Sequence, residues 1–218
     1  MNSNEVIEKI ESTKVIIIVR GVSLEVLLPL ADALYDGGVR LMEITYSAHG
    51  EPTDEEVAAN LRELVNHTKG RMIIGSGTVT RKSQIDLTCA AGASFIVSPD
   101  TNPEIISYTK QKGLVSIPGA LTPSEITLAK RSGADYVKLF PANAMGASYL
   151  KAIKAPLSDV KILAVGGVDE KTIPEYLSAG ASGFGIGTKF GNPALLREGK
   201  FAEITEVART YVEMAGGK

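Results

Sequence analysis

The sequence predicts a closed (β/α)8 barrel that spans residues 1–218 as a single domain. Eight short apolar runs alternate with amphipathic stretches at a spacing of ~20–30 residues, which favours parallel strands joined by crossover helices. The chain has 218 residues, 44% of them hydrophobic, and such barrels often contain ~200–250 residues in one domain. An open doubly wound sheet is the alternative, but the sequence lacks the G-x-G-x-x-G turn that follows the first strand of such sheets.

The predicted strands are the apolar runs themselves. They begin at Val15, Leu41, Met72, Phe95, Val115, Tyr136, Ile162 and Gly183. Each run except the last is directly followed by helix signals. After the first run, Ser23 is placed to cap a helix whose apolar positions recur with a period near 3.6. Residues 201–214 predict a terminal helix.

Helix ends are marked by capping residues. Residues 122–125 (Thr-Pro-Ser-Glu) form a capping box with proline at the first helical position, and residues 172–175 (Thr-Ile-Pro-Glu) have the same pattern. Six glycines fall between a helix and the next strand, where a left-handed C-terminal cap belongs. These are Gly38, Gly70, Gly92, Gly113, Gly133 and Gly180.

Composition narrows the functional classes. The net charge is −2 and charges of both signs are interspersed, so the sequence shows no basic patch of the kind that binds nucleic acid or a membrane surface. The single cysteine, Cys89, excludes an internal disulfide framework and a cysteine-type metal cluster, and we expect it to be a buried, inert thiol. The first 13 residues are charged and lack the apolar region of a signal peptide, and no apolar run approaches ~18 residues. We expect a soluble cytoplasmic protein.

Three ionisable residues lie on strands where chemistry is expected, because the carboxyl ends of barrel strands carry the active site. Arg20 ends the first strand, Glu43 lies inside the second and Lys138 lies near the end of the sixth. Burial lowers the pKa of a lysine, and the resulting free amine attacks carbonyl groups to form a Schiff base. Lys138 could instead extend to water, Glu43 could be only an ion-pair partner, and Arg20 could cover the rim. Burying three such groups only for one another is a poor route to stability, so we favour a site.

Glycines follow the last two strands. Gly166 and Gly167 end the seventh, and residues 185–188 (Gly-Ile-Gly-Thr) lie in the eighth. Glycine lets the backbone approach a ligand closely, and barrels of this class commonly hold a phosphate there. Tight turns are the alternative, but the position favours a phosphate-bearing substrate. Residues 75–78 (Gly-Ser-Gly-Thr), after the third strand, offer another close approach and a hydroxyl.

In this order, the segments resemble the family of 2-keto-3-deoxy-6-phosphogluconate and 6-phosphogalactonate aldolases, class I lyases also described for 4-hydroxy-2-oxoglutarate. The resemblance spans nearly the whole chain, and its combination of E-I-T, G-S-G-T-V and K-L-F-P segments is specific. The matching segments are residues 15–20 (VIIIVR), 42–45 (MEIT), 75–79 (GSGTV), 97–99 (VSP), 117–119 (IPG), 137–141 (VKLFP) and 165–168 (VGGV).

The resemblance implies a homotrimeric barrel in which Lys138 forms the Schiff base with the keto carbon of pyruvate. Glu43 would be the acid/base that moves protons through water, and Arg20 would hold the substrate carboxylate. The protonated imine is the electron sink, so no metal or cofactor is expected. The products would be pyruvate and an aldehyde, glyceraldehyde 3-phosphate or glyoxylate. Other residues have implied binding roles: Thr78, Pro99 and Phe140 at the pyruvate end, and Gly166, Gly167, Gly187 and Thr188 at the distal phosphate.

Two positions depart from the family pattern. Ser47 stands where many phosphogluconate aldolases have an arginine four residues after the strand-two glutamate, and Val165 stands where threonine is common. Ser47 would therefore offer the substrate a hydrogen bond without a charge. Two other functions remain open. One is an isomerase or transferase with a phosphate site and an electrostatic Lys138, and the other is a non-catalytic sensor of a sugar phosphate.

Overall fold

The computed structural model describes residues 2–187, 190, 196 and 198–217. All strand pairs are parallel, in the order β5-β4-β3-β2-β1-β9-β8-β7-β6. The two terminal strands of this order are consecutive pieces of one chain segment, separated only by Pro118, so the sheet closes on itself through residues 115–120. The strands are β1 Val15–Val19, β2 Leu41–Thr45, β3 Ile73–Gly77, β4 Phe95–Val97, β5 Val115–Ile117, β6 Gly119–Ala120, β7 Val137–Leu139, β8 Ile162–Val165 and β9 Gly183–Ile186.

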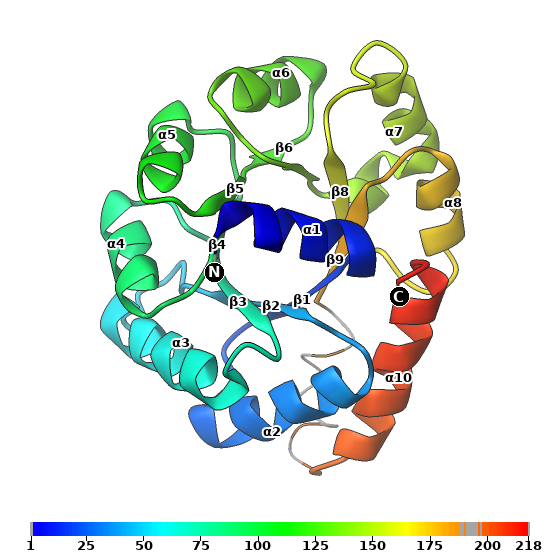
Figure 1. The fold of residues 1–218 in the computed structure, drawn as a ribbon. Helices are drawn as coiled ribbons and strands as arrows, with labels where there is room; N and C mark the ends of the chain where they lie inside the picture. Colours follow the sequence, from blue (N-terminus) through cyan, green and yellow to red (C-terminus); the bar gives the residue numbers. More distant parts are fainter. Residues whose placement is uncertain (1, 188–189, 191–195, 197, 218) are drawn as a thin grey trace.

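The predicted (β/α)8 barrel is therefore confirmed, with its fifth strand in two pieces. Six strands begin at the predicted residue, and two begin one residue later, at Ile73 and Val137. Helices surround the sheet (Figure 1). They are α1 Ser3–Thr13, α2 Leu24–Asp36, α3 Asp54–Thr68, α4 Lys82–Ala90, α5 Pro103–Gln111, α6 Pro123–Arg131, the 3-10 helix η1 Ala142–Ala144, α7 Gly146–Lys154, α8 Ile173–Ser178 and α10 Phe201–Met214.

The apolar side chains form two core layers. Residues on the outer face of the strands pack against the surrounding helices. Residues on the inner face, among them Ile16, Leu41 and Phe95, fill the barrel. Val6 and Ile10 of α1 belong to this inner layer, and Figure 1 shows α1 lying across the barrel opening. Because α1 covers the amino-terminal end, the strand-end residues of the opposite mouth are the ones left for a ligand.

Most of the predicted helix caps are confirmed. The Thr122 capping box forms, and all six glycines expected as C-terminal caps have positive φ. Ser23 is the N-cap residue of α2 as predicted, but its side chain makes no capping hydrogen bond. The second capping box was wrong: Thr172 has φ −95° and ψ −21°, already a helical conformation. Its hydroxyl turns back to Asp169, accepting from the Asp169 N–H at 2.9 Å.

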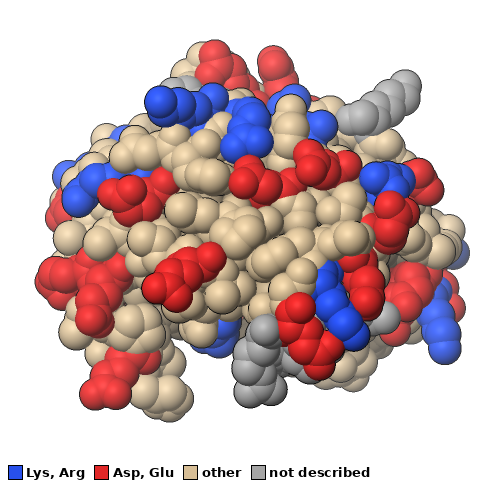
Figure 2. All heavy atoms as spheres, turned by 90° about the horizontal axis from the view of Figure 1, so that it is seen from below, with Lys and Arg blue, Asp and Glu red and all other residues tan. Residues whose placement is uncertain are grey.

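The prediction for Cys89 was also wrong, because the side chain is exposed. The buried face of α4 is formed by Gln84, Ile85 and Thr88. Cys89 follows Thr88 by one residue, a rotation of about 100° around the helix axis, which turns it away from the core. Among the described residues, no helix is both long and apolar enough to cross a membrane. Figure 2 shows acidic and basic side chains mixed over one face, as expected from the charge pattern.

Candidate active site

Lys138 lies in the sheet at the carboxyl-terminal mouth of the barrel. Its register partners are Gly119 on β6 and Leu163 on β8, and its N–H donates to Pro118 O at 2.8 Å. The residue is only 8% exposed. Burial lowers the pKa of the Lys138 amine below its ordinary range, while Glu43 raises it and Arg20 lowers it further. The net direction is downward, so a larger fraction of this amine is uncharged at neutral pH.

Glu43 lies on the second strand, and its carboxyl group is buried. The residue is 2% exposed and pairs with Ile18 on β1 and Gly75 on β3. Burial raises the pKa of Glu43, and Lys138 and Arg20 oppose that rise. A Cβ added to Gly77 would lie 1.7 Å from Glu43 Oε1. Only glycine at position 77 therefore leaves room for the carboxyl group, and this close packing holds its place in the mouth.

Arg20 and Thr78 form a second polar pair. Arg20 Nη2 donates to Thr78 Oγ1 at 3.2 Å, so the residues after β1 and β3 are joined. Thr78 has φ 58°, a left-handed conformation that is unusual for a β-branched residue. Such backbone strain clusters at functional sites, where the surrounding structure maintains it. Arg20 is exposed, so its guanidinium remains open to a ligand.

The apolar residues predicted at the pyruvate end, Pro99 and Phe140, are exposed beyond β4 and β7. The Phe140 ring centroid is 4.7 Å from Lys138 Nζ, which places the ring beside the amine. The carbonyl oxygen of Pro99 would lie 2.3 Å from a Cβ at Gly119, so the ends of the fourth and fifth strands pack closely. These contacts place both residues around the mouth.

Ser47 lies beyond β2, and its hydroxyl is used within its own loop. Ser47 Oγ donates to Glu51 O at 2.8 Å and accepts from His49 N at 3.1 Å. The structure thus gives this side chain a role in holding the loop. Its predicted contact with substrate is not tested by these contacts and remains a prediction.

The glycines predicted to hold a phosphate follow β8 and β9. Gly166 and Gly167 have φ +95° and +68°, which glycine adopts at little cost. A Cβ at Gly167 would lie 2.4 Å from the side-chain amide of Asn143, and Asn143 N donates to Gly166 O at 3.1 Å. Gly187 follows β9, and Thr188 lies outside the described residues. Asn143 was not identified from the sequence, where only its place just after the K-L-F-P segment marks it.

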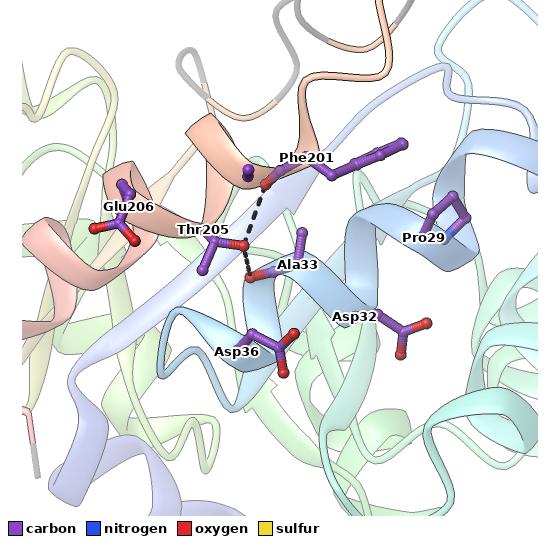
Figure 3. A pocket seen from close by; sticks show the side chains of 8 residues that line it. Pro29, Asp32, Ala33, Asp36, Phe201, Thr205 and Glu206 are labelled. Atoms are coloured by element: carbon purple, nitrogen blue, oxygen red, sulfur yellow. Dashed lines mark hydrogen bonds between the residues drawn. The ribbon is translucent and has the colours of Figure 1, made fainter.

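A separate groove lies in the helix layer between α2 and α10 (Figure 3). Its volume is about 450 Å³. The single hydroxyl hydrogen of Thr205 is shared between Ala33 O of α2 at 3.0 Å and Phe201 O of its own helix at 3.1 Å. Asp32, on its rim, pairs with His67 and Arg71. The groove holds none of the strand-end residues described above, and its acidic side chains suit neither a carboxylate nor a phosphate. It is lined by Pro29, Asp32, Ala33, Asp36, Phe201, Ala202, Thr205 and Glu206.

The fold and the mouth residues together define a parallel barrel with a buried amine, a buried carboxyl group and an open guanidinium at its carboxyl end. These are the parts of a site for nucleophilic and acid–base chemistry on a carbonyl compound. The chain belongs to the KDPG and KHG aldolase family, whose model matches residues 6–207. The family expected from the sequence is thereby confirmed.

Two similar proteins and one designed assembly illustrate this relationship. The chain is 32% identical to the 2-dehydro-3-deoxy-6-phosphogalactonate aldolase of Escherichia coli (strain K12), over 87% of this chain and 88% of that protein. The KDPG aldolase of Legionella pneumophila was solved with pyruvate captured at low pH as a covalent carbinolamine intermediate. Its structure has a TM-score of 0.82 and 30% identity, covering 92% of this chain and 95% of that chain. A cube-shaped protein cage designed by fusing symmetric oligomeric domains has a TM-score of 0.80 and 29% identity, covering 92% of this chain and 71% of that chain.

Proposed function

We propose that the protein is a class I aldolase that cleaves a 2-keto-3-deoxy-6-phospho sugar acid, or 4-hydroxy-2-oxoglutarate, into pyruvate and an aldehyde. The observation that carries this proposal is the buried Lys138 amine, whose pKa burial lowers, in the same mouth as the buried Glu43. The family and the carbinolamine of the Legionella enzyme support it. An isomerase, a transferase or a non-catalytic sensor is not favoured by these relationships.

Lys138 begins the reaction by attacking the C2 keto carbon of the substrate. Loss of water from the carbinolamine gives a protonated imine, which accepts the electron pair of the C3–C4 bond as that bond breaks. Glu43 takes the proton of the C4 hydroxyl, and the aldehyde leaves. Through a water molecule, Glu43 then protonates C3 of the enamine, and hydrolysis releases pyruvate and the free amine. Because its pKa is raised, Glu43 can hold the proton between these steps, and such transfers contribute ~10²–10⁴-fold.

The remaining predicted residues would bind the substrate. Arg20 offers planar, bidentate donors to the carboxylate, and the Thr78 hydroxyl lies beside it. The exposed faces of Pro99 and Phe140 would line the pyruvate end. The distal phosphate would lie at the strand-end backbone after β8 and β9, with Ser47 contributing at most a neutral contact. The phosphate residues proposed are Gly166, Gly167, Gly187 and, outside the described residues, Thr188.

Borohydride reduction in the presence of pyruvate tests the covalent step. We expect a stable mass adduct on Lys138 in the intact protein, located by peptide mass spectrometry, and no adduct in Lys138→Met. Lys154 is an internal control, because burial also lowers its pKa, yet it lies on α7 and donates to Ser158 O and Val160 O. An unmodified Lys138 in the wild-type protein would contradict the proposal and favour an isomerase or transferase. A panel of 2-keto-3-deoxy acids, with and without the 6-phosphate, would then identify the substrate.

We also propose that the protein is a homotrimer that acts in the cytoplasm and that residues 1–218 form one domain. The cage built from symmetric oligomeric domains supports an oligomer, and one continuous sheet supports a single domain. Light scattering coupled to size exclusion should give the mass of three chains, and thermal unfolding should follow one transition. Cell fractionation would test the location.

A further inference from the structure

We propose that Thr45 is a positioning residue of the proton relay and holds the water that connects Glu43 to the substrate. The inference rests on the proposed function and adds a residue to its machinery. Thr45 ends β2 and is 5% exposed. Across the described part of the chain, its Oγ1 is the buried side-chain polar atom that has no hydrogen-bond partner.

Strand geometry places this hydroxyl beside the Glu43 carboxyl group. Successive side chains of a strand point to opposite faces, so residues 43 and 45 share one face. Ile44 and Tyr46, which alternate with them, pack in the outer core layer, so residues 43 and 45 face the barrel interior. Thr45 pairs with Gly77, and Glu43 Oε1 lies over that same Gly77. The hydroxyl and the carboxyl group are therefore neighbours on the inner face.

Core packing does not account for this hydroxyl. A buried hydroxyl without a partner costs free energy, and valine would fill the same volume without that cost. Other buried hydroxyls have partners: Ser76 Oγ lies 2.8 Å from Thr88 Oγ1, and Thr109 Oγ1 donates to Ile105 O at 2.8 Å. The Thr45 hydroxyl differs because it lies at the reactive end of β2. A partner that binds there during the reaction would satisfy it.

The protonated Glu43 carboxyl group gives its proton to the water held by Thr45 Oγ1, and that water gives a proton to C3 of the enamine. The enamine π electrons form the new C–H bond, and the nitrogen lone pair restores the C=N bond of the protonated imine. Water is regenerated, and Glu43 becomes a carboxylate. Thr45 neither gains nor loses a proton, which is why it is a positioning residue and not an acid or base.

Exchange of the pyruvate methyl protons in D2O, followed by NMR, isolates this step because it needs no aldehyde. We expect Thr45→Val to slow the exchange by at least about tenfold. This is less than the ~10²–10⁴-fold that positioned proton transfer typically contributes, because Glu43 itself remains in place. Thr45→Ser, which keeps the hydroxyl, should retain most of the rate. The final extent of borohydride trapping on Lys138 should stay unchanged in both variants. The Tm of Thr45→Val should be equal to or above that of the wild type, since the unpaired hydroxyl is gone.

Thr109→Val is the matched control, a buried threonine on α5 whose loss should lower the Tm and leave the exchange rate unchanged. If Thr45→Val exchanges as fast as the wild type, or if Thr45→Ser is as slow as Thr45→Val, the hydroxyl has no role in the relay and the inference is wrong. Thr45→Ala provides the same comparison if Thr45→Val does not fold. A wild-type protein that neither traps pyruvate nor exchanges its protons contradicts the proposed function itself, a result distinct from either variant outcome.

Discussion

Arg20 Nη2 and Thr78 Oγ1 lie 3.2 Å apart, joining the ends of the two strands that flank the one carrying Glu43. Thr78 makes this contact from a left-handed backbone conformation at φ 58°. The Arg20 guanidinium, which lowers the pKa of Glu43, is thus held by a residue whose own backbone conformation is costly. Such preorganisation lowers the cost of ordering a long side chain when the substrate binds.

The first prediction concerns the planar guanidinium group of Arg20, whose N–H groups can bind a carboxylate through two hydrogen bonds. Arg20→Lys keeps the charge and loses the planar bidentate geometry, so we expect kcat/KM to fall by about 10–100-fold, mostly through KM. Steady-state kinetics with the phosphorylated keto acid measures this. Arg71→Lys, on the loop before β3, is the control and should retain wild-type kinetics. Equal kinetics for Arg20→Lys and wild type would show that Arg20 does not bind the carboxylate through two donors.

The second prediction concerns the space beside Glu43. Gly77→Ala adds a Cβ 1.7 Å from Oε1 and must displace the carboxyl group. A misplacement of about 1 Å can cost ~10²-fold, and we expect a loss of that order in kcat while pyruvate is still trapped on Lys138. Ser76→Ala is the matched control on the opposite face of the same strand. It should lower the free energy of unfolding by about 1 kcal/mol and leave kcat unchanged.

The third prediction concerns how the two charged neighbours of Lys138 shift its titration in opposite directions. Glu43 raises the pKa of Lys138 and Arg20 lowers it. Glu43→Gln should therefore move the pH profile of imine formation to lower pH, and Arg20→Gln should move it to higher pH. The rate of borohydride trapping, measured against pH, reports both shifts independently of the absolute rate. Shifts in the same direction would contradict the electrostatic arrangement of the mouth.

The fourth prediction concerns stability. Since the folded-state pKa of Lys138 is lowered, the unfolded chain binds more protons between that value and the ordinary lysine pKa of ~10.4. This term makes the wild type less stable as the pH falls through that window. Lys138→Met removes this term, so the variant should gain stability relative to the wild type at neutral pH. The difference should shrink toward pH ~10.4, as denaturant unfolding across pH would show.

The fifth prediction tests the phosphate position. Gly187 lacks a positive φ, and a Cβ there would meet Ile18 Cβ at an ordinary 3.6 Å, so Gly187→Ala should be tolerated. Gly187→Asp adds a negative charge at the proposed phosphate site and should raise KM for a phosphorylated substrate by about tenfold or more. Trapping of pyruvate, which has no phosphate, should not change. If Gly187→Asp weakened pyruvate trapping as much as it raised KM for the phosphorylated substrate, the phosphate would not bind at Gly187.

The strands could be predicted from the sequence because each is a short apolar run with a clear boundary, and most begin at the expected residue. Two predictions made from local sequence patterns were wrong, each for a different reason. Thr172 was expected to cap α8, but Asp169 engages its hydroxyl within the preceding turn. Cys89 was expected to be buried because its neighbours are apolar, whereas the burial of a helical residue depends on its angle around the axis.

The site was only partly visible in the sequence. Lys138 and Glu43 stand out because a charged residue inside an apolar strand is unusual. The importance of Gly77 and Thr45 depends on the pairing of β2 with β3, which sets their place beside the Glu43 carboxyl group. Asn143 likewise gains its place from its packing against Gly167. Such register-dependent contacts join segments distant in the chain, and no local pattern in the sequence reports them.

Val6 and Ile10 of α1 cover the amino-terminal end of a barrel whose interior is filled by the side chains of its own strands. The substrate would then enter, and both products leave, through the carboxyl-terminal mouth. In the proposed mechanism pyruvate stays bonded to Lys138 after cleavage, so the aldehyde departs first, and the water that releases pyruvate enters through the space that the aldehyde has left. The covalent bond to Lys138 therefore sets the order in which the two products leave, and the closed end restricts both to the carboxyl-terminal mouth.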